Sequence, residues 1–201
     1  MPTAIADTIK RPRRDGPNVV FSLNVPIPPA IGRLATDLHS NISGFDRVRD
    51  RHTLVCKRFG VDDVGAGESD RPRPPKSEAV ETLRRDLRGP LSETVPFEVE
   101  VTGIDAFETP VSGTGPVVYL VVESDGLVRL HRRLCAAYGA INGIEGDDYV
   151  PHITLARGGD PDVTPETVDR IRRDEIEPIR WRVHALDLYD PEFREVVATI
   201  E

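Results

Sequence analysis

The stretch Tyr149-Val-Pro-His152-Ile-Thr154-Leu-Ala-Arg157 alternates polar and apolar side chains, as a half-buried β-strand does. Side chains two positions apart share a face of a strand, so His152 and Thr154 point the same way while the residues between and after them enter the core. Arg157 lies an odd number of positions from His152. Strict alternation therefore places Arg157 on the opposite face, unless the strand ends or twists there.

The order of elements around this strand occurs twice in the chain. The first half predicts strands near 19–25, 51–58 and 97–101, with helices near 31–38 and 77–87 between them. The second half predicts strands near 117–122 and 149–157, helices near 127–134 and 164–171, and closing strands near 179–188 and 193–200. We therefore expect an α+β fold in which two pseudo-symmetric lobes, each a β-α-β-α-β repeat, surround a central groove that the two matched second strands share.

The domain boundaries follow from this repeat. Residues 1–17 carry four cations and no apolar period, and we expect them to form a flexible N-terminal arm. Residues 18–201 are then a single two-lobed domain, with the lobe repeats at about 18–108 and 116–201. The Gly- and Pro-rich residues 60–75 are expected to form a loop within the first repeat.

The composition of the chain bears on where in the cell the protein is expected to reside. Apolar residues make up 38% and charged residues 30% of the 201 residues, which is typical of a soluble globular protein. No apolar run approaches the roughly 20 residues that span a bilayer, and the N-terminus lacks the layout of a signal peptide. We expect a cytoplasmic protein without a membrane partner.

The charged residues limit the kinds of ligand that the protein is expected to bind. A net charge of −8 argues against broad, non-specific binding to a phosphate backbone. However, only three of the 26 cationic residues are lysines, and arginine can make bidentate contacts with phosphate. A few arginines in a groove would therefore matter more than the overall charge.

Metal and cofactor sites are not indicated. Cys56 and Cys135 lie far apart in sequence and form neither a disulfide framework nor a zinc pattern. Asp147 and Asp148 precede His152, but no further ligand has suitable spacing. We expect no metal and no cofactor.

The matched strand of the first half reads Arg51-His52-Thr53-Leu54-Val55-Cys56-Lys57 and allows two registers. In the first, His52 faces the groove together with Leu54, while Thr53 points into the core. In the second, Thr53 and Arg51 face the groove, and His52, Leu54 and Cys56 pack inward. The second register fits the binary pattern better, whereas the first keeps a second imidazole, which can give or take a proton near neutral pH. A β-bulge could reconcile them.

Three segments resemble a known family: 19–29, the strand that contains His52, and 149–157. They are similar to the 2H phosphoesterases, in particular to the RNA 2′-5′ ligase and RNA 2′,3′-cyclic phosphodiesterase branch, over nearly the whole chain from Val19 to Ile200. That family is defined by two His-x-Thr/Ser motifs, one per lobe. His152-Ile-Thr154 matches the second motif, whereas the first departs from it, with Leu54 where the threonine belongs.

The resemblance implies a metal-independent phosphodiesterase that acts on 2′,3′-cyclic phosphate or 2′-5′ phosphodiester ends of RNA or small nucleotides, by histidine general acid–base catalysis. RNA ends or cyclic nucleotides are then its substrates, and no stable protein partner is expected. On family grounds His52 faces the groove. The implied site consists of catalytic His52 and His152 and phosphate-binding Thr154, Thr53, Arg157 and Arg51. The alternative is an RNA- or nucleotide-binding relative whose altered first motif leaves little or no turnover.

Overall fold

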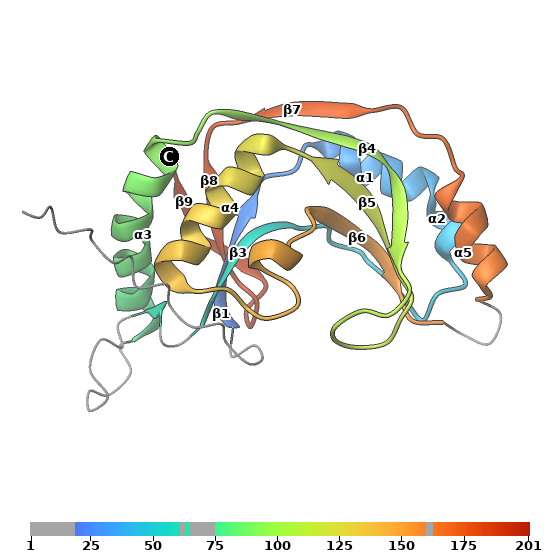
Figure 1. The fold of residues 1–201 in the computed structure, drawn as a ribbon, viewed down its shortest axis with the longest axis horizontal. Helices are drawn as coiled ribbons and strands as arrows, with labels where there is room; N and C mark the ends of the chain where they lie inside the picture. The colour runs from blue at the N-terminus through green and yellow to red at the C-terminus, as the bar shows by residue number, and fades with distance from the viewer. Residues whose placement is uncertain (1–18, 61–62, 65–74, 160–162) are drawn as a thin grey trace, which may run out of the picture.

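The strands join into one curved antiparallel sheet in the computed structural model, which describes residues 19–60, 63–64, 75–159 and 163–201 (Figure 1). The sheet order is β7-β4-β5-β6-β3-β1-β8-β9, and β2 pairs with β6. The strands are β1 (Val19–Val25), β2 (Arg47–Val48), β3 (Leu54–Gly60), β4 (Phe97–Phe107), β5 (Val117–Glu123), β6 (His152–Arg157), β7 (Ile179–Val183), β8 (Leu186–Asp190) and β9 (Glu195–Ile200). The expected α+β fold class is confirmed.

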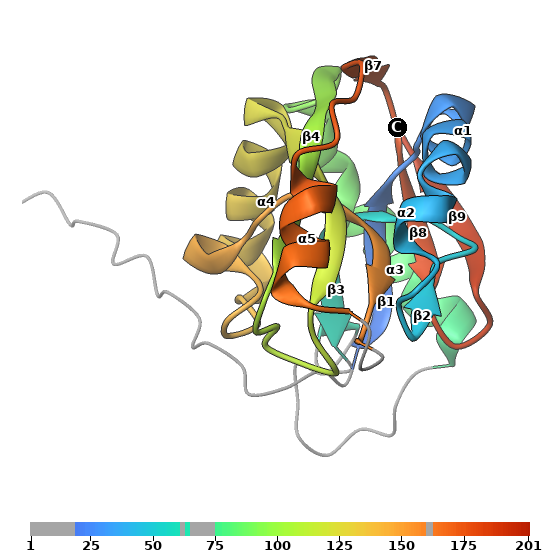
Figure 2. The same cartoon turned by 90° about the vertical axis from the view of Figure 1, so that its right-hand side faces the viewer.

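Helices cover the sheet from both sides, with α4 and α1 on opposite sides of the molecule in Figure 2. The helices are α1 (Pro29–Asp37), α2 (His39–Ile42), α3 (Lys76–Ser92), α4 (Asp125–Tyr138) and α5 (Pro165–Arg172), with a 3-10 turn, η2 (Gly146–Asp148). Helix α4 buries Leu127, Leu130 and Leu134 at helical spacing, as their periodicity predicts. Within the described residues, no helix is long and apolar enough to cross a membrane.

The two sequence halves exchange strands across the sheet. Strand β4 ends the first half but pairs with β5 of the second, and β8 of the second half pairs with β1 of the first. Consequently β3 and β6 become neighbours, in register at Leu54 and Ile153. The matched second strands of the repeat therefore lie side by side.

Two details differ from the sequence expectation. The strand predicted at 179–188 is two strands, β7 and β8, which pair with β4 and β1 respectively. Elements α2 and β2 have only four and two residues, too few for a periodic pattern. The predicted arm at 1–17 and most of the predicted loop at 60–75 lie outside the described residues.

The close packing of α4 on β4 leaves no room for a side chain at Gly126. A Cβ atom at this position would lie 2.3 Å from the Cβ atom of Phe97, so the helix would have to shift. We expect Gly126→Ala to lower the free energy of unfolding by about 1–3 kcal/mol, measured by urea denaturation. Gly32 in α1 is the matched control, because a Cβ atom there meets nothing within 4 Å. Gly32→Ala should raise stability by up to about 1 kcal/mol, and a loss equal to that of Gly126→Ala would contradict the argument.

Candidate active site

A groove of about 680 Å³ lies over the junction of β3 and β6. Its walls come from these two strands, the segments that precede them, the β4–β5 loop and the β8–β9 turn. Most of the lining side chains are polar or cationic, and the ones that matter chemically are Arg49, Arg51, Thr53, Arg58, His152, Thr154, Arg157 and Arg194. The only carboxylate among the described residues that line it is that of Asp148, which accepts a hydrogen bond from the Gly143 backbone N–H (3.2 Å).

The ring of His152 is held in one tautomer. Its Nδ1 atom lies 2.7 Å from the carbonyl oxygen of Val150, and because a carbonyl can only accept, Nδ1 carries the proton. The Nε2 atom is then left with a free lone pair. Phe107 and Tyr119 contact the ring edge-on, each with a centroid separation of 5.2 Å. His152 is therefore oriented as a proton acceptor in the groove.

Tyr119 and Phe107, the two rings that contact His152, are held in place by contacts of their own. Tyr119 stacks on Phe107, and its hydroxyl donates to Oδ2 of Asp105 (3.4 Å). Arg172 donates from Nε to Oδ1 of the same carboxylate (2.8 Å). Burial, reinforced by Asp105, raises the pKa of Tyr119 to about 12, so the hydroxyl keeps its proton. Sequence reasoning missed Phe107, whose one available signal is its position at the end of a long strand.

Burial lowers the pKa of His152 and is the largest effect; the Val150 hydrogen bond opposes it, and the charges of Arg58 and Arg157, each a smaller effect than that bond, lower the pKa as well. The imidazole therefore stays neutral down to a lower pH than a free histidine does, and it becomes protonated only as the pH falls through this lowered pKa. We expect Arg58→Gln to raise the pKa of His152, because it removes one of these charges. An NMR titration of the His152 ring measures this shift, and an unchanged midpoint would contradict it.

A β-bulge in β6 turns Arg157 into the groove. Two consecutive residues of β5 pair with Thr154 and Ala156, which leaves Leu155 as an extra residue. Leu155 and Ala156 are both fully buried, and Arg157 returns to the face of His152 and Thr154. The strict alternation that placed Arg157 on the opposite face therefore does not hold.

In β3 and the residues that lead into it, the structure shows the second of the two registers. Arg51 and Thr53 line the groove, whereas His52 is half-buried and does not line it. Leu54 and Cys56 are fully buried, and their burial fixes the register. The expectation that His52 faces the groove is thus not met. The Arg51 guanidinium donates to the backbone oxygen of Arg194 (2.9 Å), which ties it to the β8–β9 turn.

A second bulge, at Cys56, brings Arg58 to the groove. Neighbouring residues of β1 pair with Val55 and Lys57, so Cys56 is the extra residue. Arg58 then lines the groove, while Lys57 turns into the core. Sequence reasoning missed Arg58; the available signal is the pair of adjacent cations, Lys57 and Arg58, within an otherwise apolar strand.

The model of the 2′-5′ RNA ligase superfamily matches residues 69–192, more than half of the chain. The chain belongs to this superfamily. Membership supports a phosphoesterase activity in general, in agreement with the sequence expectation. The matched range contains strand β6 with His152, Thr154 and Arg157, but it begins after β3. No curated protein matches the chain.

Solved structures share the superfamily fold. TT0787 of Thermus thermophilus superposes with a TM-score of 0.55 at 20% identity, over 90% of this chain and 96% of that one. Escherichia coli LigT complexed with 3′-AMP gives 0.54 at 19% identity, over 90% and 92%. LigT complexed with NADP+ gives 0.52 at 19% identity, over 86% and 87%. At these identities the likeness concerns the fold.

A buried ion pair holds the β3 bulge of this superfamily member in place. Lys57 and Glu145 have side chains 2% and 0% exposed, so neither charge has access to water, and their Nζ and Oε2 atoms lie 2.7 Å apart. Glu145 also accepts from the backbone N–H of Arg58 through Oε1 (2.9 Å) and from that of Ile141 through Oε2 (3.1 Å). The Glu145 carboxylate thereby accepts backbone N–H groups from both the irregular strand β3 and the segment before η2.

His131 completes this buried network. Its Nδ1–H donates to the carbonyl oxygen of Cys56 (2.6 Å), and its Nε2 accepts from the backbone N–H of Gly146 (2.8 Å), so the ring is neutral. Burial lowers the pKa of His131 in keeping with this state. Tyr149 stacks on the ring at 3.7 Å and donates to the carbonyl oxygen of Val55 (2.7 Å). These contacts position β3, which presents Arg58 and is directly preceded by Thr53.

Metal ligands are not gathered in the part of the chain that the structure describes. Those residues contain no group of three or more His, Cys, Asp or Glu side chains suited to hold a metal ion. Cys56 and Cys135 are free thiols, and burial raises the pKa of each.

Proposed function

We propose that the chain is a metal-independent phosphodiesterase acting on 2′,3′-cyclic phosphate or 2′-5′ phosphodiester ends of RNA or small nucleotides. The observation that carries the proposal is the state of His152, with Nδ1 donating to Val150 and Nε2 free in a groove shared with Thr154 and several arginines. Nucleotide binding by LigT, solved with 3′-AMP and with NADP+, supports a nucleotide as the ligand of the same fold.

The reaction follows from these groups. His152 takes a proton from water through Nε2, the water oxygen attacks phosphorus, and the opposite phosphorus–ribose oxygen bond breaks. The hydroxyls of Thr154 and Thr53 donate to non-bridging oxygens, while Arg51 and Arg58 offset the developing negative charge. The departing ribose oxygen takes its proton from solvent water, because Arg51 occupies the place where the 2H pattern has a second histidine. A phosphate monoester and a ribose hydroxyl result.

The presence of Arg51 where the 2H pattern has a histidine also favours a second candidate function. Arg51 is a phosphate ligand but not a proton shuttle at neutral pH. A groove with one imidazole and several guanidinium groups would also suit a protein that binds nucleotides or RNA ends without turning them over. His52 remains a predicted second catalytic histidine only if its side chain turns toward the groove.

Hydrolysis of 2′,3′-cyclic nucleotides in excess chelator tests the proposal. We expect the wild-type rate to survive the chelator, and its abolition would overturn metal independence. Arg51→Ala should slow hydrolysis strongly, whereas a rate loss of equal size in His52→Ala would assign the second catalytic position to His52. Absent turnover together with retained binding of 3′-AMP would favour the binding protein.

A further inference from the structure

The β8–β9 turn, residues 191–194, is fixed by one buried carboxylate. Asp190 is the last residue of β8, pairs with Glu195 across the turn, and is only 2% exposed. Its Oδ1 atom accepts from the backbone N–H groups of Glu192 (2.9 Å) and Phe193 (3.4 Å). The side chain of Asp190 therefore holds the backbone of the turn from its base.

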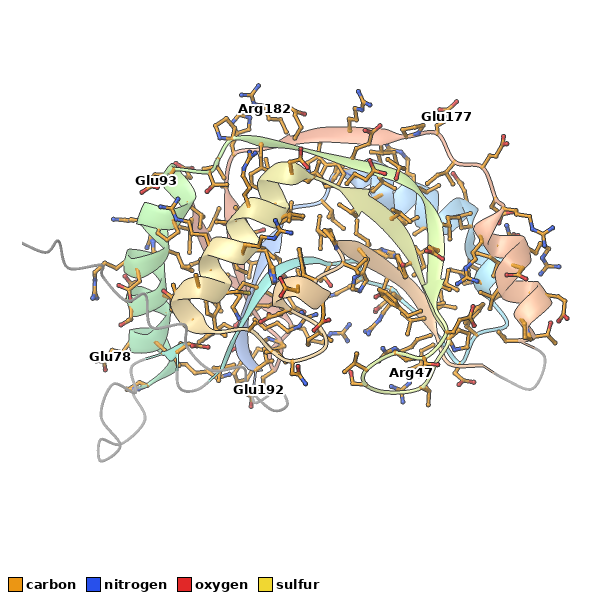
Figure 3. The ribbon with its side chains drawn as sticks, viewed as in Figure 1. Arg47, Glu78, Glu93, Glu177, Arg182 and Glu192 are labelled. Atoms are coloured by element: carbon orange, nitrogen blue, oxygen red, sulfur yellow. The ribbon has the colours of Figure 1, made fainter. Side chains whose placement is uncertain are left out.

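Lys76, the first residue of α3, ties the same turn to a helix. Its Nζ atom donates to Oδ2 of Asp190 (2.7 Å) and to Oε2 of Glu192 (2.5 Å), and it lies 4.6 Å from the centroid of the Phe193 ring. Figure 3 labels Glu192 of the turn and Glu78 of the first turn of α3 along the same lower edge of the molecule. Both oxygens of Asp190 are thus engaged, one by the turn and one by the helix.

Arg194 ends the turn in a left-handed backbone conformation. Its φ is 57°, and it is the one non-glycine residue with a positive φ in the part of the chain that the structure describes. Such a conformation costs energy in an L residue and persists where surrounding contacts impose it. The bonds from Asp190 to the two preceding residues impose it here, and a contact of the Arg194 side chain with Asp50 (3.4 Å) adds to them. The direction of the Arg194 carbonyl group is therefore set by the turn.

Arg51 receives its restraint from that carbonyl group. Arg51 is exposed, so packing does not select one rotamer for it. Within the described residues, the Arg194 carbonyl oxygen is the one hydrogen-bond acceptor of the Arg51 guanidinium, at 2.9 Å from Nη1. An arginine that is already held loses less conformational entropy when it binds phosphate, and its other N–H donors stay available.

We propose that Asp190 is a positioning residue for Arg51. By fixing the β8–β9 turn, Asp190 places the Arg194 carbonyl oxygen that holds the Arg51 guanidinium in the groove. Asp190 itself touches neither the groove lining at His152 nor the ligand, and acts only through Arg51. The inference rests on the proposed function for the role of Arg51 as a phosphate ligand.

Calorimetric binding of 3′-AMP tests this path without turnover. We expect Asp190→Ala to weaken binding by about threefold to tenfold, and Arg51→Ala, which removes the whole guanidinium, by at least about tenfold. In the Arg51→Ala background, Asp190→Ala should cost less than about twofold, because the group that it positions is gone. A cost as large in that background as in wild type would overturn the proposal.

Two variants separate positioning from a general loss of structure. Asp190→Asn keeps an oxygen that can accept from the backbone N–H groups of Glu192 and Phe193, so it should restore most of the affinity. Asp187→Ala is the matched control, because it removes an aspartate of the same strand that accepts from Oγ1 of Thr199 (2.7 Å) and not from the turn. Its affinity should stay within about twofold of wild type. Equal losses in Asp187→Ala and Asp190→Ala would contradict the proposal, and thermal unfolding confirms that each variant is folded.

The order of the Arg51 side chain gives a readout that needs no ligand. The Nε–H group of Arg51 should have a clearly higher NMR order parameter in wild type than in Asp190→Ala, whereas Asp187→Ala should match wild type. Equal order in wild type and Asp190→Ala would overturn the positioning role whether or not a nucleotide binds. Absent hydrolysis in wild type, together with loss of Arg51 order in Asp190→Ala, would instead count against the proposed function alone.

Discussion

Replacing His152 with alanine is expected to lower kcat for a 2′,3′-cyclic nucleotide by about 10²–10⁴-fold, the usual contribution of a positioned general base. The physical reason is that Nε2 of His152 is the free imidazole nitrogen held in the groove, with its tautomer set by Val150. Single-turnover hydrolysis at neutral pH measures the effect. Binding of 3′-AMP should change far less, because the arginines and threonines remain.

Two further variants make this result specific. His152→Asn can still donate to Val150 but cannot take a proton, so it should lose as much activity as alanine while keeping its stability. His39→Ala removes an exposed histidine of α2 and should leave the rate unchanged. Full activity in His152→Asn would show that His152 only shapes the groove.

Removing Glu145 should have the largest effect on stability. Glu145→Ala leaves the ammonium of Lys57 buried without its partner and strips acceptors from the backbone N–H groups of Arg58 and Ile141. Breaking a buried pair in this way costs about 3–5 kcal/mol, so the urea midpoint should fall steeply. The β3 bulge should loosen with it, because Glu145 bonds two consecutive residues of that strand.

An ion pair that is partly open to water provides the comparison, since the side chain of Glu100 is 21% exposed. Glu100→Ala breaks the pair with Arg180, which is 74% exposed, and should cost no more than about 1 kcal/mol. Replacing both buried partners, as in Lys57→Met with Glu145→Leu, should recover part of the loss, because no unpaired charge remains. Equal costs for Glu145→Ala and Glu100→Ala would refute the role assigned to the buried pair.

Much of the fold was predictable because it depends on local periodicity. The alternation in 97–101 and the helical spacing of Leu127, Leu130 and Leu134 each reflect contact with a single apolar layer. The exchange of β4 and β8 between the sequence halves was not predictable in this way. Strand pairing depends on contacts between segments far apart in sequence, which periodicity does not report.

The residues of the candidate site also fall into two groups, those that the sequence pattern predicted and those that only the tertiary structure brought to the groove. His152 and Thr154 follow from a spacing of two on a regular strand, and the sequence alone determined that they share a face. Which residue stands opposite them, and whether Arg157 and Arg58 reach the groove, was decided only by tertiary structure. Both outcomes depend on bulges at Leu155 and Cys56, which shift the alternation by one.

The physical reason lies in the cost of burying particular groups. Turning His52 into the groove would carry Leu54 out of the core, whereas the observed register buries Leu54 and Cys56 completely. The following bulge sends Lys57 inward, where Glu145, distant in sequence, neutralises it. The sequence alone therefore determined a strand that resembles those of phosphoesterases, and the repeated order of elements around it. Core packing and the buried carboxylate of Glu145 decided which residues lie opposite His152 in the groove.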